Sequence, residues 1–136
     1  MAQTQKPTAI GYSEIAKLVA GEAATCVKSI VGLTGACTAA EASTFLNPGG
    51  ATKLAANGFT LADADSVKTS TTTNANDTVE LDHVFTATGA QSVSGFAIES
   101  DDDDVVIAEC CFADAIVCAA TDTITCEMKI QFKLGS

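Results

Sequence analysis

The sequence predicts a mainly β protein: an antiparallel β-sandwich, jelly-roll-like, with a short N-terminal helix and one short helical turn. Residues 123–134 alternate strictly between polar and apolar side chains, and residues 78–88 alternate in nearly the same way. Such alternation is typical of a strand with one face on a core and the other in water. Two facing layers are the economical way to bury several one-sided strands.

The chain has 136 residues, the size of one domain that can bury a core of its own. We therefore expect a single domain, 1–136. Within it, residues 1–22 are expected to form an N-terminal arm and helix, and residues 23–136 the sandwich.

The first elements are an arm and a helix. Residues 1–8 are polar and indicate an extended arm. A helix is predicted over 12–20, with Ser13 as a possible N-cap and Gly21 as its stop, because one stripe is apolar: Ile15, Leu18 and Val19.

A strand is predicted next, over 25–33. Thr38 and Glu41 have the spacing of a capping box, which predicts a short helix or helical turn over 39–45. The sequence Asn47-Pro48-Gly49-Gly50 should end it.

The middle of the chain has a weaker pattern. A strand is expected near Phe59 or around Val67, and the Thr/Asn-rich residues 70–77 should form an exposed connection. The strand over 78–88 then has an apolar row of Val79, Leu81, His83 and Phe85.

The second half is predicted to be an antiparallel meander of four strands. Besides 78–88, its strands are expected over 92–100, 105–112 and 123–134, with an acidic turn at 101–104. In the expected pairing, Cys110 lies opposite Ile124 and Ala108 opposite Cys126. That register puts the apolar side chains of both strands on one face and leaves Glu109 in water.

Charge excludes one class of partner. Seven lysines, no arginine and seventeen acidic residues give a net charge of −10. Nucleic-acid binding needs clustered cations, so no nucleic-acid partner is expected. No run of eighteen apolar residues is present, so no transmembrane helix or membrane partner is expected. The N-terminus lacks the pattern of a secretory signal, and we expect the chain to fold in a cytoplasm.

The six cysteines are Cys26, Cys37, Cys110, Cys111, Cys118 and Cys126. They contain no CxxC pair, and one histidine is available to join them, so a zinc site is not predicted. Reduced, buried thiols are favoured over a disulfide framework, with Cys110 and Cys126 on the inward faces of their strands. If a bridge forms, Cys26 to Cys37 is the expected local pair.

Few residues qualify as site candidates. Residues 101–104 are four aspartates, which suit either calcium or, better, a solvated turn, because the spacing of a calcium loop is missing. His83 has no accompanying nucleophile motif and reads as a core or interface histidine. Asp63 and Asp65 could pair as acids, but a loop or edge strand explains them equally well. No phosphate-binding glycine motif occurs. We predict no catalytic, cofactor-binding or metal residue, no cofactor and no enzyme activity.

The order of short motifs along the chain is a further feature of the sequence. After the N-terminal helix come Ile30-Val-Gly-Leu-Thr-Gly35, Asp77-Thr-Val-Glu-Leu81, Val93-Ser-Gly-Phe96, Val106-Ile-Ala-Glu109 and Ala119-Ala-Thr-Asp-Thr-Ile-Thr125. This layout is similar to that of small structural proteins of tailed viruses, of tail-fibre-like, head-fibre and capsid decoration type. The likeness covers most of the chain and is best over 77–132. The six cysteines depart from that family.

The resemblance implies a non-enzymatic virion structural protein, assembled in the host cytoplasm. It implies a capsid decoration or head-surface protein that acts through oligomeric surface contacts. Its expected partners are the major capsid protein or tail proteins, and a homotrimer is the expected oligomer. The alternatives are a tail- or fibre-associated component, a β-sandwich module that binds a receptor or glycan, and a filament subunit, which would require export.

Overall fold

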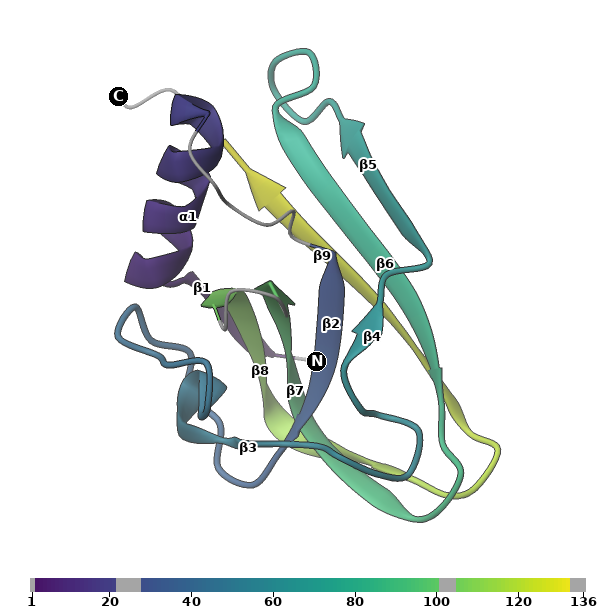
Figure 1. The fold of residues 1–136 in the computed structure, drawn as a ribbon. Coiled ribbons are helices and arrows are strands. Elements are labelled where there is room, and N and C mark those ends of the chain that lie inside the picture. The colour runs from purple at the N-terminus through teal and green to yellow at the C-terminus, as the bar shows by residue number, and fades with distance from the viewer. Residues whose placement is uncertain (1, 22–27, 101–104, 133–136) are drawn as a thin grey trace.

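The protein is an antiparallel β-sandwich, and its described residues include one α-helix and one 3-10 turn, which confirms the predicted fold class (Figure 1). The computed structural model describes residues 2–21, 28–100 and 105–132. The elements in chain order are β1 (Gln3–Pro7), α1 (Ala9–Ala20), β2 (Ser29–Thr34), the 3-10 turn Pro48–Gly50, β3 (Thr52–Lys53), β4 (Ala62–Asp63), β5 (Ser66–Ser70), β6 (Thr78–Thr86), β7 (Gln91–Ser100), β8 (Val105–Cys118) and β9 (Thr123–Gln131).

The two sheets differ in width. Within the described residues, the wide sheet has the order β1-β8-β7-β2-β3, with β4 also paired to β2. The narrow sheet has the order β5-β6-β9. The predicted acidic turn at 101–104 and the start of the strand predicted over 25–33 lie outside the described residues.

The predicted four-strand meander is wrong. β7 and β8 pair with each other in the wide sheet, whereas β6 and β9 pair in the narrow one. The chain changes sheets between β6 and β7 and again between β8 and β9. Backbone hydrogen bonds hold these two connections together: Ala87 N–H donates to Asp122 O and Thr121 N–H to Ala87 O, both at 2.8 Å. Each strand with one apolar face therefore buries that face against the opposite sheet.

The predicted register between the last two strands is wrong for the same reason. Cys110 lies opposite Phe96 of β7, and Cys126 lies opposite His83 of β6. Both cysteines still face the core, because the strand period fixes the face of a side chain and not the identity of its neighbour strand.

The N-terminal arm is a strand of the wide sheet. Residues Gln3 to Pro7 pair antiparallel with β8. α1 follows at once and begins at Ala9, three residues earlier than predicted, and its N-cap is Thr8 instead of Ser13. The Thr8 Oγ1 accepts a hydrogen bond from Gly11 N–H at 2.9 Å and donates one to the carbonyl of Val106. The same side chain thus caps the helix and joins it to β8.

The main core lies between the sheets and contains a row of aromatic rings. The ring of Phe85 stacks on those of Phe59 and Phe96, with centroids 5.7 and 5.1 Å away, and Phe112 meets Phe96 edge-on at 5.8 Å. Phe59 itself lies in a loop, shortly before the two-residue strand β4. The alternative around Val67 is confirmed as β5.

The outer face of the wide sheet is buried as well, beneath the loop of residues 35–51. Val31, Leu33, Ala51, Ala97 and Val106 form a second apolar cluster there. Glu109, predicted to lie in water, is 1% exposed on this face. Its Oε1 accepts hydrogen bonds from Ala40 N–H and Ser43 Oγ, both at 2.6 Å. The prediction failed because no sequence pattern shows that a loop covers this face.

The same contacts explain why the short helix or helical turn predicted over 39–45 is reduced to one hydrogen-bonded turn, from Ser43 N–H to Ala40 O at 3.2 Å. The backbone N–H of Ala40 donates to Glu109, and that of Thr38 donates to Gly49 O at 2.8 Å. These groups are tied to the sheet and to the turn that follows, so they do not serve a capping box. The helical turn of this region is Pro48–Gly50 instead.

A disulfide between Cys37 and Cys111 fastens the loop to β8, with the Cα atoms 5.4 Å apart. The expected Cys26–Cys37 pairing is therefore wrong, and Cys26 itself lies outside the described residues. Cys110, Cys118 and Cys126 are free and buried, as predicted.

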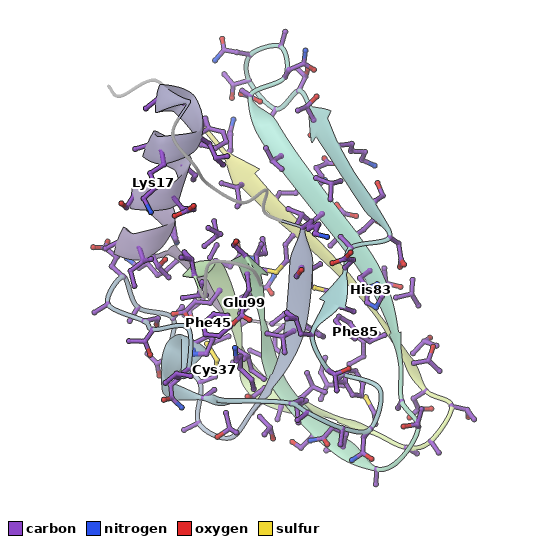
Figure 2. The ribbon with its side chains drawn as sticks, in the orientation of Figure 1. Lys17, Cys37, Phe45, His83, Phe85 and Glu99 are labelled. Atoms are coloured by element: carbon purple, nitrogen blue, oxygen red, sulfur yellow. A yellow bond between two sulfur atoms is a disulfide. The ribbon has the colours of Figure 1, made fainter. Side chains whose placement is uncertain are left out.

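A buried ion pair adds to this layer, and Figure 2 labels Glu99 of that pair, together with Phe45, near Cys37. Glu99 of β7 is fully buried, and its Oε2 lies 3.1 Å from Lys53 Nζ. The same ammonium lies 3.3 Å from the centroid of the Phe45 ring. The ammonium of Lys53 thus neutralises the carboxylate of Glu99 by direct contact, and a buried carboxylate requires such a partner.

Candidate functional site

The sandwich is open along one side, where β1 and β8 of the wide sheet face β9 of the narrow one. A groove of about 740 Å³ lies there. Its apolar wall is formed mainly by Phe96, Ile98, Phe112, Ile124 and Met128, while glutamines and lysines line its rim. This groove is the candidate functional site.

The groove exists because the narrow sheet is too narrow to cover the whole inner face of the wide sheet. Adjacent strands lie about 4.8 Å apart, so a path of five strands exceeds a path of three by about 10 Å. α1 covers part of the difference, since Ile15 packs against the main core. A second cavity of about 340 Å³ lies beneath the helix, and Val19 and Phe132 at its rim are 84% and 47% exposed. The apolar surface therefore continues from the groove onto α1.

Free strand edges flank the groove. Within the described residues, β1 pairs with β8 alone and β9 with β6 alone. Edge strands present unpaired backbone N–H and C=O groups to a further strand. In β1 this capacity ends at Pro7, which has no N–H to donate. The nine residues of β9 form the longer edge. This arrangement can bind an extended segment of another chain. The segment's backbone would form hydrogen bonds with the free strand edge, and its side chains would enter the groove.

The charges around this framework leave an acidic surface. Each of the six lysines in the described part of the chain lies within 4 Å of a carboxylate. Glu80 illustrates the effect: the hydroxyl of Ser70, the ammonium of Lys129 and that of Lys68 hold the pKa of this carboxyl down, at about 2. The excess acidic residues remain for solvent or for a basic partner.

The sequence candidates lie elsewhere. Asp63 accepts a hydrogen bond from Ser29 Oγ and pairs with Lys28 at 3.1 Å, contacts that lower the pKa of its carboxyl. Asp65 Oδ2 accepts a hydrogen bond from Val84 N–H at 2.9 Å. Asp63 thus joins β4 to β2, and Asp65 joins the connection between β4 and β5 to β6; neither lines the groove.

His83 lies on β6 beside Phe85, and Figure 2 shows the two labelled side by side. The rings meet edge-on with centroids 4.4 Å apart. Its Nδ1 is 3.2 Å from Asp65 Oδ2, a distance that suits an ion pair when the imidazole is protonated, although the direction does not make a hydrogen bond. His83 is half-buried in the sandwich and does not line the groove. The aspartates of 101–104 lie outside the described residues.

The sequence reading did not find the groove. The strict alternation of β9 shows which of its faces is apolar, but not that one edge of the strand has no neighbour. One sequence feature could have indicated a free edge: the polar run Gln3-Thr4-Gln5-Lys6 is typical of an exposed edge strand.

Neither a membrane-spanning helix nor a metal-holding cluster occurs in the residues that the structure describes. No helix there is long and apolar enough to cross a membrane. No group of three or more His, Cys, Asp or Glu side chains there is arranged to hold a metal ion.

In comparisons with known proteins, no family model, no curated protein and no solved structure matches the chain.

Proposed function

We propose that this chain is a non-enzymatic structural protein of a tailed-virus particle, a capsid decoration or head-surface protein that acts through surface contacts. The observation that carries the proposal is the apolar groove between two free strand edges. A surface of this kind suits permanent contact with another chain. The order of motifs along the sequence, which is similar to that of such virion proteins, supplies the biological setting.

The first contact we propose is between copies of this chain. The β1 edge and the β9 edge lie on different sheets, so a contact of β1 with β9 of the next copy is heterologous. Heterologous contacts close into a ring when the rotation between copies is right. A ring of three copies would bury the groove and the exposed apolar side chains of α1 in each interface.

The second contact we propose is with the major capsid protein. Because the lysines of the described residues are already paired with carboxylates, the acidic surface complements a basic patch on the partner. Such attraction depends on ionic strength, so binding to the capsid should weaken as salt is raised.

Antibody labelling of intact particles that carry this chain tests the proposal. Regularly spaced label on the head is the expected result. Label confined to the tail would replace the head assignment with the tail or fibre alternative. Particles that carry no label, with the chain found only in the host extract, would contradict the proposal.

Sedimentation of the purified chain tests the self-contact separately. A trimer is expected, and Phe132→Lys should give monomers because it puts a charge into the apolar rim of the groove. Val117→Lys is the matched control: Val117 is also an exposed apolar residue, but it does not line the groove. A monomeric wild type, or equal effects of the two variants, would exclude the groove as the interface.

A further inference from the structure

The backbone of β1 presents its free hydrogen-bonding groups on alternate residues. On the side of β8, Thr8 N–H donates to Ile107 O at 3.0 Å, and Ala2 O accepts a hydrogen bond from β8 at 2.9 Å. Successive residues of a strand direct their backbone groups to opposite edges, so the even-numbered residues of this arm face β8. The N–H and C=O groups of Gln3 and Gln5 therefore point to the free edge.

β9 alternates in the same way. On the side of β6, the N–H of Phe132, next to the end of the strand, donates to Asp77 O at 2.8 Å. The even-numbered residues of β9 thus face β6. The odd-numbered residues, among them Thr125, Glu127 and Lys129, present their N–H and C=O groups at the free edge, where no further strand lies among the described residues.

The side chains of the two edges are out of step by one residue. In β1, the residues with free backbone groups turn their side chains to the groove: Gln3 Oε1 accepts the hydrogen bond of Cys110 Sγ at 2.8 Å. In β9, the residues with free backbone groups turn their side chains outward, and Glu127 is exposed. The residues between them, such as Met128, pack toward the core and the groove.

This difference in phase decides the direction in which the two strands can join. In an antiparallel pair, a residue with free groups bonds to the residue directly opposite. Gln5 of one copy would then lie opposite a residue such as Glu127 of the next, and the charged face of β9 would continue the groove. In a parallel pair, a residue bonds to the two neighbours of the residue opposite it, so Gln5 lies opposite Cys126 or Met128. The parallel arrangement therefore keeps the groove-facing sides of both strands together.

Charge decides the register. In the parallel arrangement, Thr4 and Lys6 lie opposite outward residues of β9 in the next copy. Lys6 opposite Glu127 brings unlike charges together and places Thr4 opposite Thr125. A shift toward the end of β9 would put Lys6 opposite Lys129, and a shift toward its start would leave Lys6 without a charged partner. Cross-strand pairs of unlike charges and of threonines stabilise a sheet, whereas like charges destabilise it.

Both charges are available for this contact. Within one copy, Lys6 Nζ lies 3.9 Å from Glu41 Oε1, and Lys129 Nζ lies 2.7 Å from Glu127 Oε1. The four side chains are between 49% and 70% exposed. Exposed ion pairs of this kind contribute little to stability, so a neighbouring strand can add to them or replace them.

We propose that β1 of one copy joins β9 of the next as a parallel strand, with Lys6 opposite Glu127 and Thr4 opposite Thr125. The inference rests on the proposed contact between copies, and it adds the direction of the strands and the residues that meet. In this register Gln5 N–H donates to the carbonyl of Thr125, and Gln5 O accepts from the N–H of Glu127. The narrow sheet of each copy is thereby continued by the wide sheet of another.

Disulfide trapping between copies tests the direction and the register. Directly opposite residues on neighbouring strands have Cα atoms about 4.8 Å apart, within the range of a disulfide. In a Thr4→Cys, Thr125→Cys double variant, oxidation with diamide should therefore link the copies covalently, seen as trimers on a non-reducing gel. Within one copy the two residues lie on the outward faces of different sheets, so no link forms there.

A Thr4→Cys, Gln131→Cys variant is the matched control. Gln131 shares the outward face of Thr125 but lies about 20 Å further along β9, so this variant should not link. Circular dichroism of each variant checks that it folds.

Charge exchange tests the pair itself. Lys6→Glu and Glu127→Lys should each weaken association by about 2- to 30-fold per contact, because an attractive cross-strand pair becomes a repulsive one. The Lys6→Glu, Glu127→Lys double variant should recover the association of the wild type, since each contact regains unlike charges. Asp114→Lys makes the same change of charge at an exposed residue of β8 that does not pair with β1, and it should sediment like the wild type.

The outcomes separate this inference from the proposed contact on which it rests. A wild type that sediments as a monomer would remove both. A trimeric wild type whose Thr4→Cys, Thr125→Cys variant links no better than the Gln131 control would overturn the strand direction and register alone. Failure of the charge-exchange variant to recover association would likewise overturn the pairing of Lys6 with Glu127 and leave the contact between copies standing.

Discussion

At the scale of single residues, Asp77 organises a surface loop that composition alone describes as an exposed connection. Its carboxylate accepts hydrogen bonds from the backbone N–H groups of Thr72, Thr73 and Asn74 at 2.9, 3.0 and 2.9 Å. The side-chain amide of Gln131 in β9 donates a further one at 3.0 Å. One side chain thus shapes the turn between β5 and β6 and ties it to β9.

These donors hold the pKa of the Asp77 carboxyl well below its usual range, with the backbone N–H groups of Asn74 and Thr72 contributing most. A carboxyl whose pKa is lower in the folded state stabilises the protein above its unfolded pKa of about 4 and loses that contribution as pH falls through the folded value. Asp77→Asn should therefore unfold at lower urea concentration at pH 7 and show a shallower loss of stability below pH 4. Asp114→Asn, at an exposed aspartate, should follow the wild type, and identical acid profiles for all three proteins would contradict the role of Asp77.

Glu109 is the second residue whose role is specific. Replacing it with alanine leaves Ala40 N–H and Ser43 Oγ without their acceptor beneath the loop of residues 35–51. Ser43 Oγ is buried, and an unsatisfied buried partner costs about 1–3 kcal/mol, so Glu109→Ala should lower the free energy of unfolding by about that amount. Glu127→Ala, which removes an exposed ion pair with Lys129, should cost about 0–1 kcal/mol. Urea denaturation distinguishes the two, and equal effects would be inconsistent with a buried anchor.

At the scale of elements, α1 is positioned by close contact with β8. A Cβ on Gly11 would clash with the carbonyl oxygen of Ile107, so no larger residue fits without moving the helix. The stability of α1 thus depends on this contact and on the Thr8 cap more than on its own propensity.

Two opposed effects make Gly11→Ala informative. In an isolated helix the change would stabilise by about 1 kcal/mol. Here the clash should outweigh that gain and destabilise the protein by about 1–3 kcal/mol. Ser13→Ala, at an exposed position of the same helix, should stay within about 0.5 kcal/mol of the wild type. A more stable Gly11→Ala protein would show that α1 is not seated on β8.

The N-cap gives a separate prediction for the same helix. Thr8→Ala removes the acceptor for Gly11 N–H and should cost about 0.5–2 kcal/mol by thermal unfolding. The Ser13→Ala protein is again the comparison, because Ser13 is the cap that the sequence pattern suggested. A larger loss of stability in Ser13→Ala than in Thr8→Ala would instead support Ser13 as the N-cap, as the sequence pattern suggested.

At the scale of the whole molecule, the disulfide joins residues 74 positions apart and fixes the loop layer on the wide sheet. Closing a loop of that length should stabilise the fold by about 2–4 kcal/mol, chiefly by restricting the unfolded chain. Reduction with dithiothreitol should lower the urea midpoint accordingly. Cys118→Ala should keep the full sensitivity to reductant, whereas a Cys37→Ser, Cys111→Ser double variant should lose it. A wild type unaffected by complete reduction would contradict this prediction.

Much of the fold could be predicted because local patterns carry it. The alternation in β6 and β9 places each strand and its apolar face, and the stripe of Ile15, Leu18 and Val19 places most of α1. The candidate site could be predicted only in part: the inward faces of Cys110 and Cys126 follow from the strand period, but the groove does not.

By itself, the sequence determined the fold class, the position of most strands, the core-facing side of β6 and β9 and the acidic charge. The tertiary structure alone decided that β6 pairs with β9 and β7 with β8, that Cys37 joins Cys111, that Glu109 is buried and that one side of the sandwich is open. The physical reason is range. Periodicity and turn chemistry act over a few residues, whereas strand partners, covering loops and uncovered edges depend on contacts between residues far apart in the chain, which no local pattern encodes.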